Sequence, residues 1–456
     1  MLQQTPSNLN PNLSFGTDGM RGRAQDFSQE GLKRLGYQLA QKSQGGVVLI
    51  GDDGRESAPW MREAIKGGVE AYGGRAEYMG LTPTPLLSRI TQEGDEYQAG
   101  VMITASHNPW SDNGVKIFNQ DGQKISSELE QTLEQAYHNG SVTIHPKSRR
   151  DNINVSQLSS TRTQQEYITL IQQNMKQSGL EGRIAIDCAN GATSEIIKEI
   201  FNGAHGLEAD IICNSPNGIN INENCGVLHP NTLSNYMQTS DKDYLLGISF
   251  DGDGDRMGLH NERGDVILGD YIIGFLAQQY KKQGKLRNNG VVATKYTNRK
   301  AVEFLENQEI DVHEVVNGDK AVMEKMREEE LSFGGEQSGH IICDPNLGCG
   351  DAILAMSEMI QYIDSTIPIS QQIGDLFVPN PQILESLRLE EGVDAKHKVA
   401  KFKNVIESFN KEFERKCRGR VFVRASGTEP VIRVLTEGEN EQLVKEINKE
   451  VREVLS

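Results

Sequence analysis

Short apolar runs that stop abruptly at polar, glycine-containing loops recur along this chain. Residues 47–50, 100–103 and 244–250 are such runs, and stretches with the period of an amphipathic helix lie between them. Buried strands that alternate with helices form mostly parallel sheets with helices on both faces. The pattern therefore predicts an α/β fold, and it places the polar loops at the sheet edges where such folds bind their ligands.

The chain is expected to divide into several domains, because 456 residues are too many for one ordinary core. Three similar αβ blocks follow one another, as in an old internal repeat, and a smaller α+β unit comes after them. The expected domains are residues 1–155, 156–256, 257–370 and 371–456. The polar, aperiodic segment 139–162 is interpreted as the connector that leaves the first domain.

Composition narrows the classes of function. A net charge of −17 disfavours a nucleic-acid partner, so any site for an anionic substrate must gather its own Arg and Lys residues. No apolar run approaches the length of a membrane span, and the polar start of the chain lacks the features of a signal peptide. The six cysteines form no CxxC pair, which favours free thiols in a reducing compartment. We therefore expect a cytoplasmic protein without a membrane partner.

One polar loop follows the apolar run at residues 100–103 and contains Ser106, His107 and Asn108. Lys116 comes after it, in a turn that returns the chain to a strand. An ordinary capped turn is one interpretation, because Ser and Asn are common turn formers. The position of Ser106 at the end of a buried strand suits a ligand-binding loop equally well, so this segment alone leaves both interpretations open.

Three aspartates, Asp251, Asp253 and Asp255, directly follow another buried run and are separated by glycines. Glycine lets the backbone curl, so alternate carboxylates can converge on a hard cation. An EF-hand is a poor match because Arg256 occupies the place of its sharp-turn glycine and a strand leads into the loop. A dehalogenase-type phosphatase motif would have Thr or Val where Asp255 stands, and a solvated acidic turn seldom packs three aspartates at a strand end. The pattern favours a magnesium site.

Two later segments carry groups suited to a phosphorylated sugar. Glu336 and Ser338, in a glycine-rich segment that ends at His340, offer acceptors for sugar hydroxyls. Arg424 opens the segment Arg-Ala-Ser-Gly-Thr-Glu-Pro and Arg433 lies beyond it, which forms a cup of donors for a phosphate. Each segment alone could be an ordinary turn, and a lone histidine is more often packed than catalytic.

The Ser106 loop, the aspartate loop, the glycine-rich segment and the arginine segment together carry the groups that one reaction needs. Arg21 and Lys116 add positive charge to them. A serine, a cation site, a hydroxyl-binding carboxylate and a phosphate cup suit phosphoryl transfer to and from a sugar. That chemistry consists chiefly of positioning the reactants and neutralising spread negative charge.

Five fragments, in this order, resemble the motifs of the α-D-phosphohexomutase superfamily over nearly the whole chain. They are Phe-Gly-Thr-Asp-Gly-Met-Arg-Gly at 15–22, Thr-Ala-Ser-His-Asn-Pro at 104–109, Asp-Gly-Asp-Gly-Asp-Arg at 251–256, Gly-Glu-Gln-Ser-Gly-His at 335–340 and Arg-Ala-Ser-Gly-Thr-Glu-Pro at 424–430. Each is modest alone, but five in the right order and spacing are specific. Ala105, Gln337 and the segment Gly-Ile-Asn-Ile-Asn-Glu-Asn-Cys-Gly at 218–226 make the chain most similar to the bacterial phosphoglucosamine mutases.

The resemblance implies four domains around a central active cleft, with a role for each matching residue. Ser106 would carry the phosphoryl group, with Lys116, Arg21 and His107 in catalytic roles and Arg256 in support. One Mg²⁺ would be bound by Asp251, Asp253, Asp255 and an oxygen of phosphorylated Ser106. The substrate would contact Glu336, Ser338, His340, Lys320, Arg424, Ser426, Gly427, Thr428 and Arg433. A sugar 1,6-bisphosphate would be the activator.

Departures from the family pattern concern the choice of sugar. Val227 and Leu228 replace a common Ser-Thr pair, residues 297–300 differ from the usual Ser-Asn sequence, and Lys320 stands where arginine is frequent. Lysine keeps the charge of arginine but not its forked geometry. The expected reaction interconverts glucosamine 6-phosphate and glucosamine 1-phosphate. The competing hypotheses are a phosphoglucomutase or phosphomannomutase, an inactive phosphosugar-binding regulator and a phosphatase. A homodimer is the candidate assembly.

Overall fold

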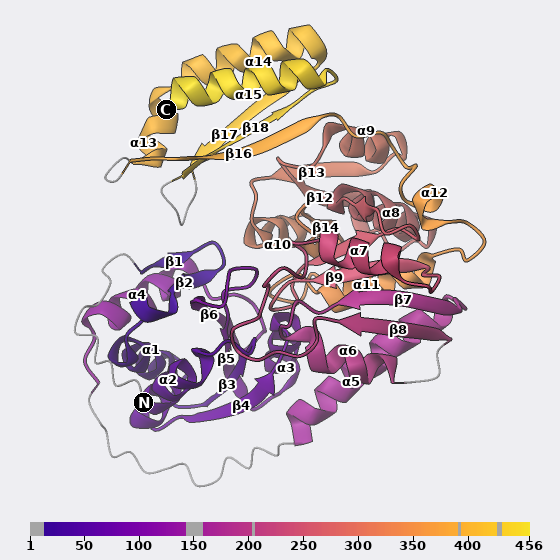
Figure 1. The fold of residues 1–456 in the computed structure, drawn as a ribbon. Coiled ribbons are helices and arrows are strands. Elements are labelled where there is room, and N and C mark those ends of the chain that lie inside the picture. Colours follow the sequence, from indigo (N-terminus) through magenta and orange to yellow (C-terminus); the bar gives the residue numbers. More distant parts are fainter. Residues whose placement is uncertain (1–12, 143–157, 203–205, 391–393, 426–430) are drawn as a thin grey trace.

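The computed structural model describes residues 13–142, 158–202, 206–390, 394–425 and 431–456. Within these residues the chain forms four β-sheets, each covered by helices (Figure 1). The first three sheet units pack against one another, and the C-terminal unit stands above them in the view of Figure 1. The predicted α/β class, with three αβ units and a smaller C-terminal unit, is confirmed.

The first unit is a six-stranded sheet in the order β1-β2-β6-β5-β3-β4. Its strands are β1 (Phe15–Gly16), β2 (Gly19–Arg23), β3 (Val47–Asp52), β4 (Arg75–Leu81), β5 (Tyr97–Ile103) and β6 (Asp112–Asn119). Its helices are η1 (Ala24–Asp26), α1 (Gln29–Lys42), α2 (Ala58–Tyr72), α3 (Thr84–Glu93) and α4 (Ser127–Asn139). Apolar side chains of β3 and β5 are buried on both faces, which explains why these strands are continuous apolar runs.

The second unit has the sheet order β11-β10-β9-β7-β8, and the third has β13-β12-β14-β15. The second contains α5 (Leu158–Gln177), β7 (Gly182–Asp187), α6 (Thr193–Phe201), β8 (Leu207–Ile212), α7 (Asn231–Thr239), β9 (Leu246–Phe250), β10 (Met257–His260) and β11 (Val266–Ile267). The third contains α8 (Gly269–Lys282), η2 (Arg287–Asn289), β12 (Gly290–Thr294), α9 (Arg299–Asn307), β13 (Asp311–Val315), α10 (Asp319–Glu328), β14 (Gly334–Gly335), β15 (Ile341–Ile342), α11 (Ala352–Tyr362) and α12 (Ile369–Gln372).

The three sheets share one connectivity. In each, the first strand of a parallel trio lies in the middle (β3, β7 or β12), the next strand pairs on one side and the third on the other. An antiparallel fourth strand (β6, β10 or β15) then pairs with the third. Only the trios are parallel, so the sheets are mixed. The shared order supports the internal repeat expected from the sequence.

A single apolar core joins the three units. Phe118 of the first sheet, Ile248 of the second and Phe275 of α8 all belong to one cluster of buried side chains. Because the interior of a protein is close-packed, such a shared core fixes the relative positions of the sheet edges. The three units therefore form one platform for the loops that project from them.

The C-terminal unit has a core of its own and an antiparallel sheet in the order β16-β18-β17. It comprises β16 (Gln382–Arg388), α13 (Ala395–Lys401), α14 (Lys403–Cys417), β17 (Arg420–Ala425), β18 (Val431–Glu437) and α15 (Glu441–Leu455). Polar contacts connect it to the third unit: the Arg299 backbone N–H donates to Glu437 Oε1 at 2.7 Å, and Arg420 Nη2 donates to the Thr297 carbonyl at 2.6 Å. Helices α14 and α15 lie on the side of the sheet away from the other units (Figure 1).

Helix α3 begins at Thr84, inside the sequence Thr-Pro-Thr-Pro at 82–85, since proline fits the first turn of a helix. The structure differs from the expected domain boundaries in one place. The third domain was expected to begin at Met257, but the hairpin of β10 and β11 pairs with β9 in the second sheet. The segment 143–157 of the expected connector lies outside the described residues. No helix in the described part of the chain is long and apolar enough to span a membrane.

Candidate active site

Three loops at equivalent places in the repeated topology meet at one point. They connect the third and fourth strands of each unit: residues 104–111 after β5, 251–256 after β9, and 336–340 after β14. Ser106 Oγ of the first loop donates to Asp251 Oδ2 of the second at 2.7 Å. His340 Nε2 of the third lies 3.3 Å from Asp255 Oδ1. The repeated fold thus brings a hydroxyl, three carboxylates and an imidazole together, although they lie far apart in the sequence.

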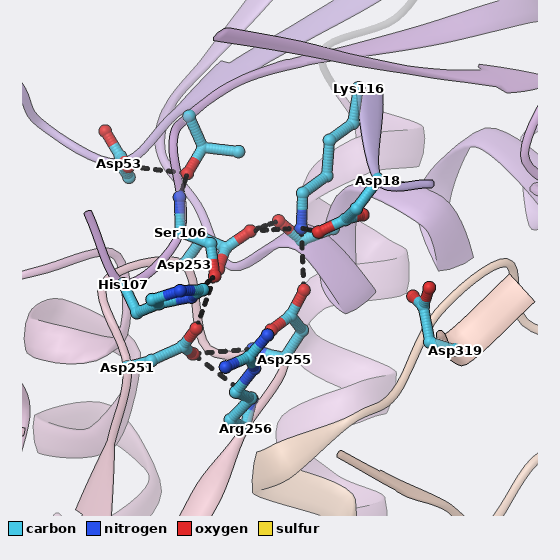
Figure 2. Close-up of polar contacts among 12 residues, drawn as sticks. Asp18, Asp53, Ser106, His107, Lys116, Asp251, Asp253, Asp255, Arg256 and Asp319 are labelled. Atoms are coloured by element: carbon cyan, nitrogen blue, oxygen red, sulfur yellow. Dashed lines mark hydrogen bonds and ion pairs between the residues drawn. The ribbon is translucent and has the colours of Figure 1, made fainter. Parts of the chain in front are cut away.

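Ser106 is fully buried and has a left-handed backbone with φ of 52°. Its backbone N–H donates to Thr104 Oγ1 at 2.7 Å, and Thr104 Oγ1 donates to Asp53 Oδ2 at 2.6 Å (Figure 2). The left-handed region is uncommon for residues other than glycine. It persists here because the surrounding hydrogen bonds fix the turn.

A buried guanidinium holds the carbonyl groups of the same loop. Arg55 is 1% exposed, and its Nε donates to Asp53 Oδ2 at 2.9 Å. Its other nitrogens donate to three carbonyl oxygens of the loop, those of Ser106, Asn108 and Pro109, and to that of Asp112 at the start of β6. The ion pair with Asp53 compensates the buried charge. Arg55 and Asp53 lie directly after β3, so their place at a strand end was the signal in the sequence that could have identified them.

Asp251, Asp253 and Asp255 are all fully buried, and one carboxylate oxygen of each lies within 4.8 Å of the others. Burial and the two neighbouring acids raise the pKa of Asp251 well above its ordinary value. Burial also acts to raise the pKa of Asp255, but His340 and Lys116 hold it below its ordinary value. Asp253 Oδ1 is buried and accepts no hydrogen bond. Three converging oxygens with an unpartnered one among them fit a hard divalent cation.

Lys116, on β6, is the cation nearest the aspartates. Its Nζ lies 2.8 Å from Asp253 Oδ2, 2.6 Å from Asp255 Oδ2 and 3.1 Å from Asp18 Oδ2 (Figure 2). Burial acts to lower the pKa of Lys116, but these carboxylates raise it well above its ordinary value. The side chain is therefore charged at neutral pH, and it can neutralise a phosphoryl group.

Asp18, which the sequence analysis did not single out, connects the cations of this site. Besides Lys116 it pairs with Arg21 and, at 2.7 Å, with Lys124. Lys124 in turn lies 2.5 Å from Asp319 at the start of α10. The cations hold the pKa of Asp18 well below its ordinary value against the opposing effect of burial. Asp18 lies inside the quoted motif at 15–22, and this chain of ion pairs connects the first unit to the third.

His107 and Arg256 flank the serine and the aspartates. His107 Nδ1 lies 3.2 Å from Ser106 Oγ. Burial, together with Arg256 and Arg21, lowers the pKa of His107 to about 2, so its ring is neutral at physiological pH. The Arg256 backbone N–H donates to Asp251 Oδ1 at 3.1 Å.

Thr84, at the start of α3, also belongs to the site, although the sequence analysis did not identify it. Its Oγ1 donates to Asp253 Oδ2 at 2.5 Å.

The third loop lies beside the aspartates and is shaped by one glycine. Gly339 has φ of 91°, and a Cβ there would lie 2.1 Å from the Met257 carbonyl oxygen, so only glycine fits. Glu336 is buried, and its Oε1 accepts a hydrogen bond from the Gly318 backbone N–H at 2.8 Å. Ser338 is exposed. Glu336 and Ser338 are thus available at the third loop, with the carboxylate fixed and the hydroxyl free in solvent.

Arg424 and Arg433 face each other on neighbouring strands β17 and β18. Arg424 reaches the third unit, where its Nε donates to Tyr296 Oη at 2.9 Å. Lys320 instead lies 3.3 Å from Ser127 Oγ and 3.4 Å from Glu130 Oε1, so the structure does not bring it to the aspartates. Ser426, Gly427 and Thr428 lie outside the described residues.

Comparisons with known proteins show which family this chain belongs to. Four sequence models of phosphoglucomutase/phosphomannomutase match in order: alpha/beta/alpha domain I at residues 12–143, domain II at 165–264, domain III at 268–378 and the C-terminal domain at 387–454. A phosphoglucosamine mutase of Campylobacter hominis is 35% identical over 449 residues, 97% of this chain and 98% of that protein. The chain belongs to the phosphoglucomutase/phosphomannomutase family.

Other members of the family are also similar to this chain over nearly its whole length. A phosphoglucosamine mutase of Thermodesulfovibrio yellowstonii is 35% identical over 454 residues, covering 96% of this chain and 98% of that one. A family protein from Burkholderia thailandensis has a similar fold, with a TM-score of 0.76 and 18% identity over 98% of both chains. The N-acetylphosphoglucosamine mutase of Aspergillus fumigatus, in complex with GlcNAc-6P and magnesium, has a TM-score of 0.69 and 18% identity, covering 99% of this chain and 96% of that one.

Proposed function

We propose that this protein is a phosphoglucosamine mutase that interconverts glucosamine 6-phosphate and glucosamine 1-phosphate through a phosphorylated Ser106. The observation that carries the proposal is the contact of Ser106 Oγ with Asp251, in a site that also holds Asp253, Asp255 and Lys116. A hydroxyl among converging carboxylates and a buried cation suits the transfer of a phosphoryl group. The names of the relatives that match nearly the whole chain support the choice of sugar.

Asp251, Asp253 and Asp255 would hold Mg²⁺ together with an oxygen of the phosphoserine. When bound, the ion supplies positive charge that neutralises the phosphoryl group. Magnesium is named in the complex of the Aspergillus fumigatus relative, which supports this choice over other hard cations. The remaining roles in the reaction are performed by side chains of the protein.

In the first transfer, the bond between Ser106 Oγ and phosphorus breaks while a bond forms from phosphorus to O1 of glucosamine 6-phosphate. The hydroxyl proton of O1 is the proton that Ser106 Oγ regains. Neutral His107 has its Nδ1 3.2 Å from Oγ, within hydrogen-bond distance of the oxygen that regains the proton. Charged Lys116 and Arg21 neutralise the phosphoryl group during its transfer, because the carboxylates around both side chains keep them protonated. The product of this step is the 1,6-bisphosphate.

The second transfer requires the bisphosphate to turn end for end, so that its 6-phosphate faces Ser106. Arg424 and Arg433 would bind whichever phosphate is not being transferred, and Glu336 would bind hydroxyl groups in both orientations. The C-terminal unit has its own core, so it can move relative to the platform while the intermediate turns. Glucosamine 1-phosphate leaves once Ser106 has taken back the phosphoryl group.

The deciding experiment compares turnover of glucosamine 6-phosphate, glucose 6-phosphate and mannose 6-phosphate, with a sugar 1,6-bisphosphate supplied as activator. We expect the highest kcat/KM for glucosamine 6-phosphate and no turnover by Ser106→Ala. A preference for glucose or mannose phosphates would identify a phosphoglucomutase or phosphomannomutase instead. Steady release of inorganic phosphate would identify a phosphatase, and failure of Ser106 to acquire a phosphoryl group would identify a binding protein.

The homodimer and the cytoplasmic location are further parts of the proposal. Light scattering of the purified protein tests the first, and fractionation of the host cells tests the second.

A further inference from the structure

The segment 218–226, Gly-Ile-Asn-Ile-Asn-Glu-Asn-Cys-Gly, has no part in the mechanism above, yet it reaches the serine loop. It belongs to the long connection between β8 and α7 of the second unit. The Gly218 carbonyl accepts a hydrogen bond from the Glu56 backbone N–H at 2.8 Å, which connects the segment to the first unit. The segment therefore crosses from one unit to another beside the reacting hydroxyl.

Asn222 is the residue of this segment that touches the serine loop. Its Nδ2 donates to the Ser106 carbonyl at 2.8 Å and to the Asn108 carbonyl at 3.1 Å. Arg55 Nη2 donates to the same two oxygens, at 2.9 and 2.8 Å. Two donors from two different units thus converge on one pair of carbonyl groups.

The backbone of Asn222 is fixed as well. Asn222 is 8% exposed, its φ is 56°, and its own N–H donates to the Ala189 carbonyl at 2.9 Å. Asparagine and glycine tolerate this left-handed conformation better than most residues. The backbone that carries the amide group is therefore anchored within the second unit.

The carbonyl groups of the serine loop need these donors. Ser106 itself is left-handed and fully buried, so its carbonyl cannot turn to water. The carbonyl oxygen is also close to the metal loop, since a Cβ on Gly252 would lie 2.6 Å from it. The orientation of this one peptide group fixes Ser106 Oγ relative to Asp251.

We propose that Asn222 is a positioning residue: from the second unit it fixes, together with Arg55, the backbone of Ser106 so that Oγ stays aligned for phosphoryl transfer. The proposal rests on the proposed function, because it assumes that Ser106 carries the phosphoryl group. Asn222 acts through the Ser106 and Asn108 carbonyls. It contacts no reacting atom and no aspartate that would bind metal.

Two substitutions of Asn222 test whether this residue positions Ser106 or only stabilises the fold. Asn222→Asp keeps the size and the tolerance for positive φ, but it replaces the donor by a carboxylate oxygen that faces two carbonyl oxygens. Asn222→Gly keeps the backbone conformation and removes the side chain altogether. Glu223→Gln is the matched control, because Glu223 is the exposed neighbour in the same segment.

The experiment follows transfer of a phosphoryl group from glucose 1,6-bisphosphate to Ser106 by intact mass, together with steady-state kinetics. We expect both Asn222 variants to lower the transfer rate and kcat by about 10- to 100-fold, the range that misplacement of a reacting group produces. In Asn222→Gly, which adds no charge, the KM for the phosphosugar and the affinity for Mg²⁺, measured by calorimetry, should stay within about twofold, because uniform binding is unaffected. Glu223→Gln should match the unmodified protein.

Wild-type transfer rates in both variants would overturn the proposal, as would a loss of rate that comes with an equal loss of Mg²⁺ affinity or of thermal stability. If Ser106 of the unmodified protein takes up no phosphoryl group, the proposed function itself fails. If Ser106 is phosphorylated but glucosamine 6-phosphate is not converted, only the sugar assignment fails. The variants are then compared with glucose 1-phosphate as substrate.

Discussion

Lys116 Nζ donates to Asp255 Oδ2 across 2.6 Å, joining β6 of the first unit to the aspartate loop of the second. The ammonium group is 1% exposed and touches Asp253 as well. A buried cation that shares two carboxylates with the expected metal site has two effects. It adds charge near the reacting phosphoryl group, and it competes with the metal for oxygen atoms.

Replacing Lys116 by Met separates these effects. We expect kcat to fall by about 10²- to 10³-fold, the range for loss of one group that stabilises charge in the transition state. The affinity for Mg²⁺ should not weaken, since the aspartates lose a competing cation. Kinetics in excess Mg²⁺ and calorimetric titration with Mg²⁺ measure the two quantities. A variant with weaker Mg²⁺ binding and unchanged kcat at saturating metal would contradict this account.

Asp251→Asn should stabilise the metal-free protein, because burial beside two other acids makes ionisation of Asp251 unfavourable and asparagine does not ionise. The same change should abolish the stabilisation by Mg²⁺, which for the unmodified protein is expected to be about 2.7 kcal/mol at a hundredfold excess over Kd. Thermal unfolding with and without Mg²⁺ measures both. Asp265→Asn, in the exposed hairpin turn beyond β10, is the control and should leave the Mg²⁺ effect intact. An Asp251→Asn variant that is still stabilised by Mg²⁺ would refute the metal site.

The sequence predicted the strand-end loops well, because they are local features. Residues 100–103 and 244–250 are short apolar runs, and the polar groups that follow them fall at the sheet edge whatever the rest of the fold does. The structure brings Ser106 and Asp251 into contact, as the order of these loops suggested. The strand-end position of each loop depends on its neighbours in the sequence alone, whereas the contact between the two loops comes from the packing of the first two units.

Contacts between distant parts of the chain could not be predicted from the sequence in the same way. Thr84 meets Asp253 only because α3 starts where the second unit docks, and the Thr-Pro-Thr-Pro sequence indicates a turn as readily as a helix start. Arg55 reaches the serine loop because β3 and β5 are neighbours in the sheet. The expected role of Lys320 in substrate binding remains a prediction, and its Nζ lies 3.4 Å from Glu130 Oε1, a contact that the sequence did not indicate.

Arg433→Ala should raise the KM for the phosphosugar by about 10-fold or more, with a small change in kcat. Arg433 lies directly opposite Arg424 across the sheet, and among the described residues it has no ion-pair partner. Like charges in this arrangement are unfavourable until an anion binds. A hydrogen bond to a charged group contributes about 1.5–3 kcal/mol, which corresponds to the expected change. Arg452→Ala, on helix α15, is the control, and an unchanged KM in Arg433→Ala would exclude Arg433 from the phosphate cup.

Asp270→Asn should raise the unfolding midpoint at pH 8 and change it little at pH 4. Asp270 is buried at the junction with the C-terminal unit; its Oδ2 accepts the Asn298 N–H at 3.1 Å, and its Oδ1 has no partner. Burial, with Glu437 nearby, raises its pKa to about 7. Folding therefore favours the protonated form, and stability falls as pH rises from about 4 to about 7, by up to about 4 kcal/mol. Asparagine does not ionise and avoids this loss. Unfolding curves across this range should show a gap between the variant and the unmodified protein that widens up to pH 7 and then stays constant; a gap independent of pH would show that Asp270 is not the titrating group.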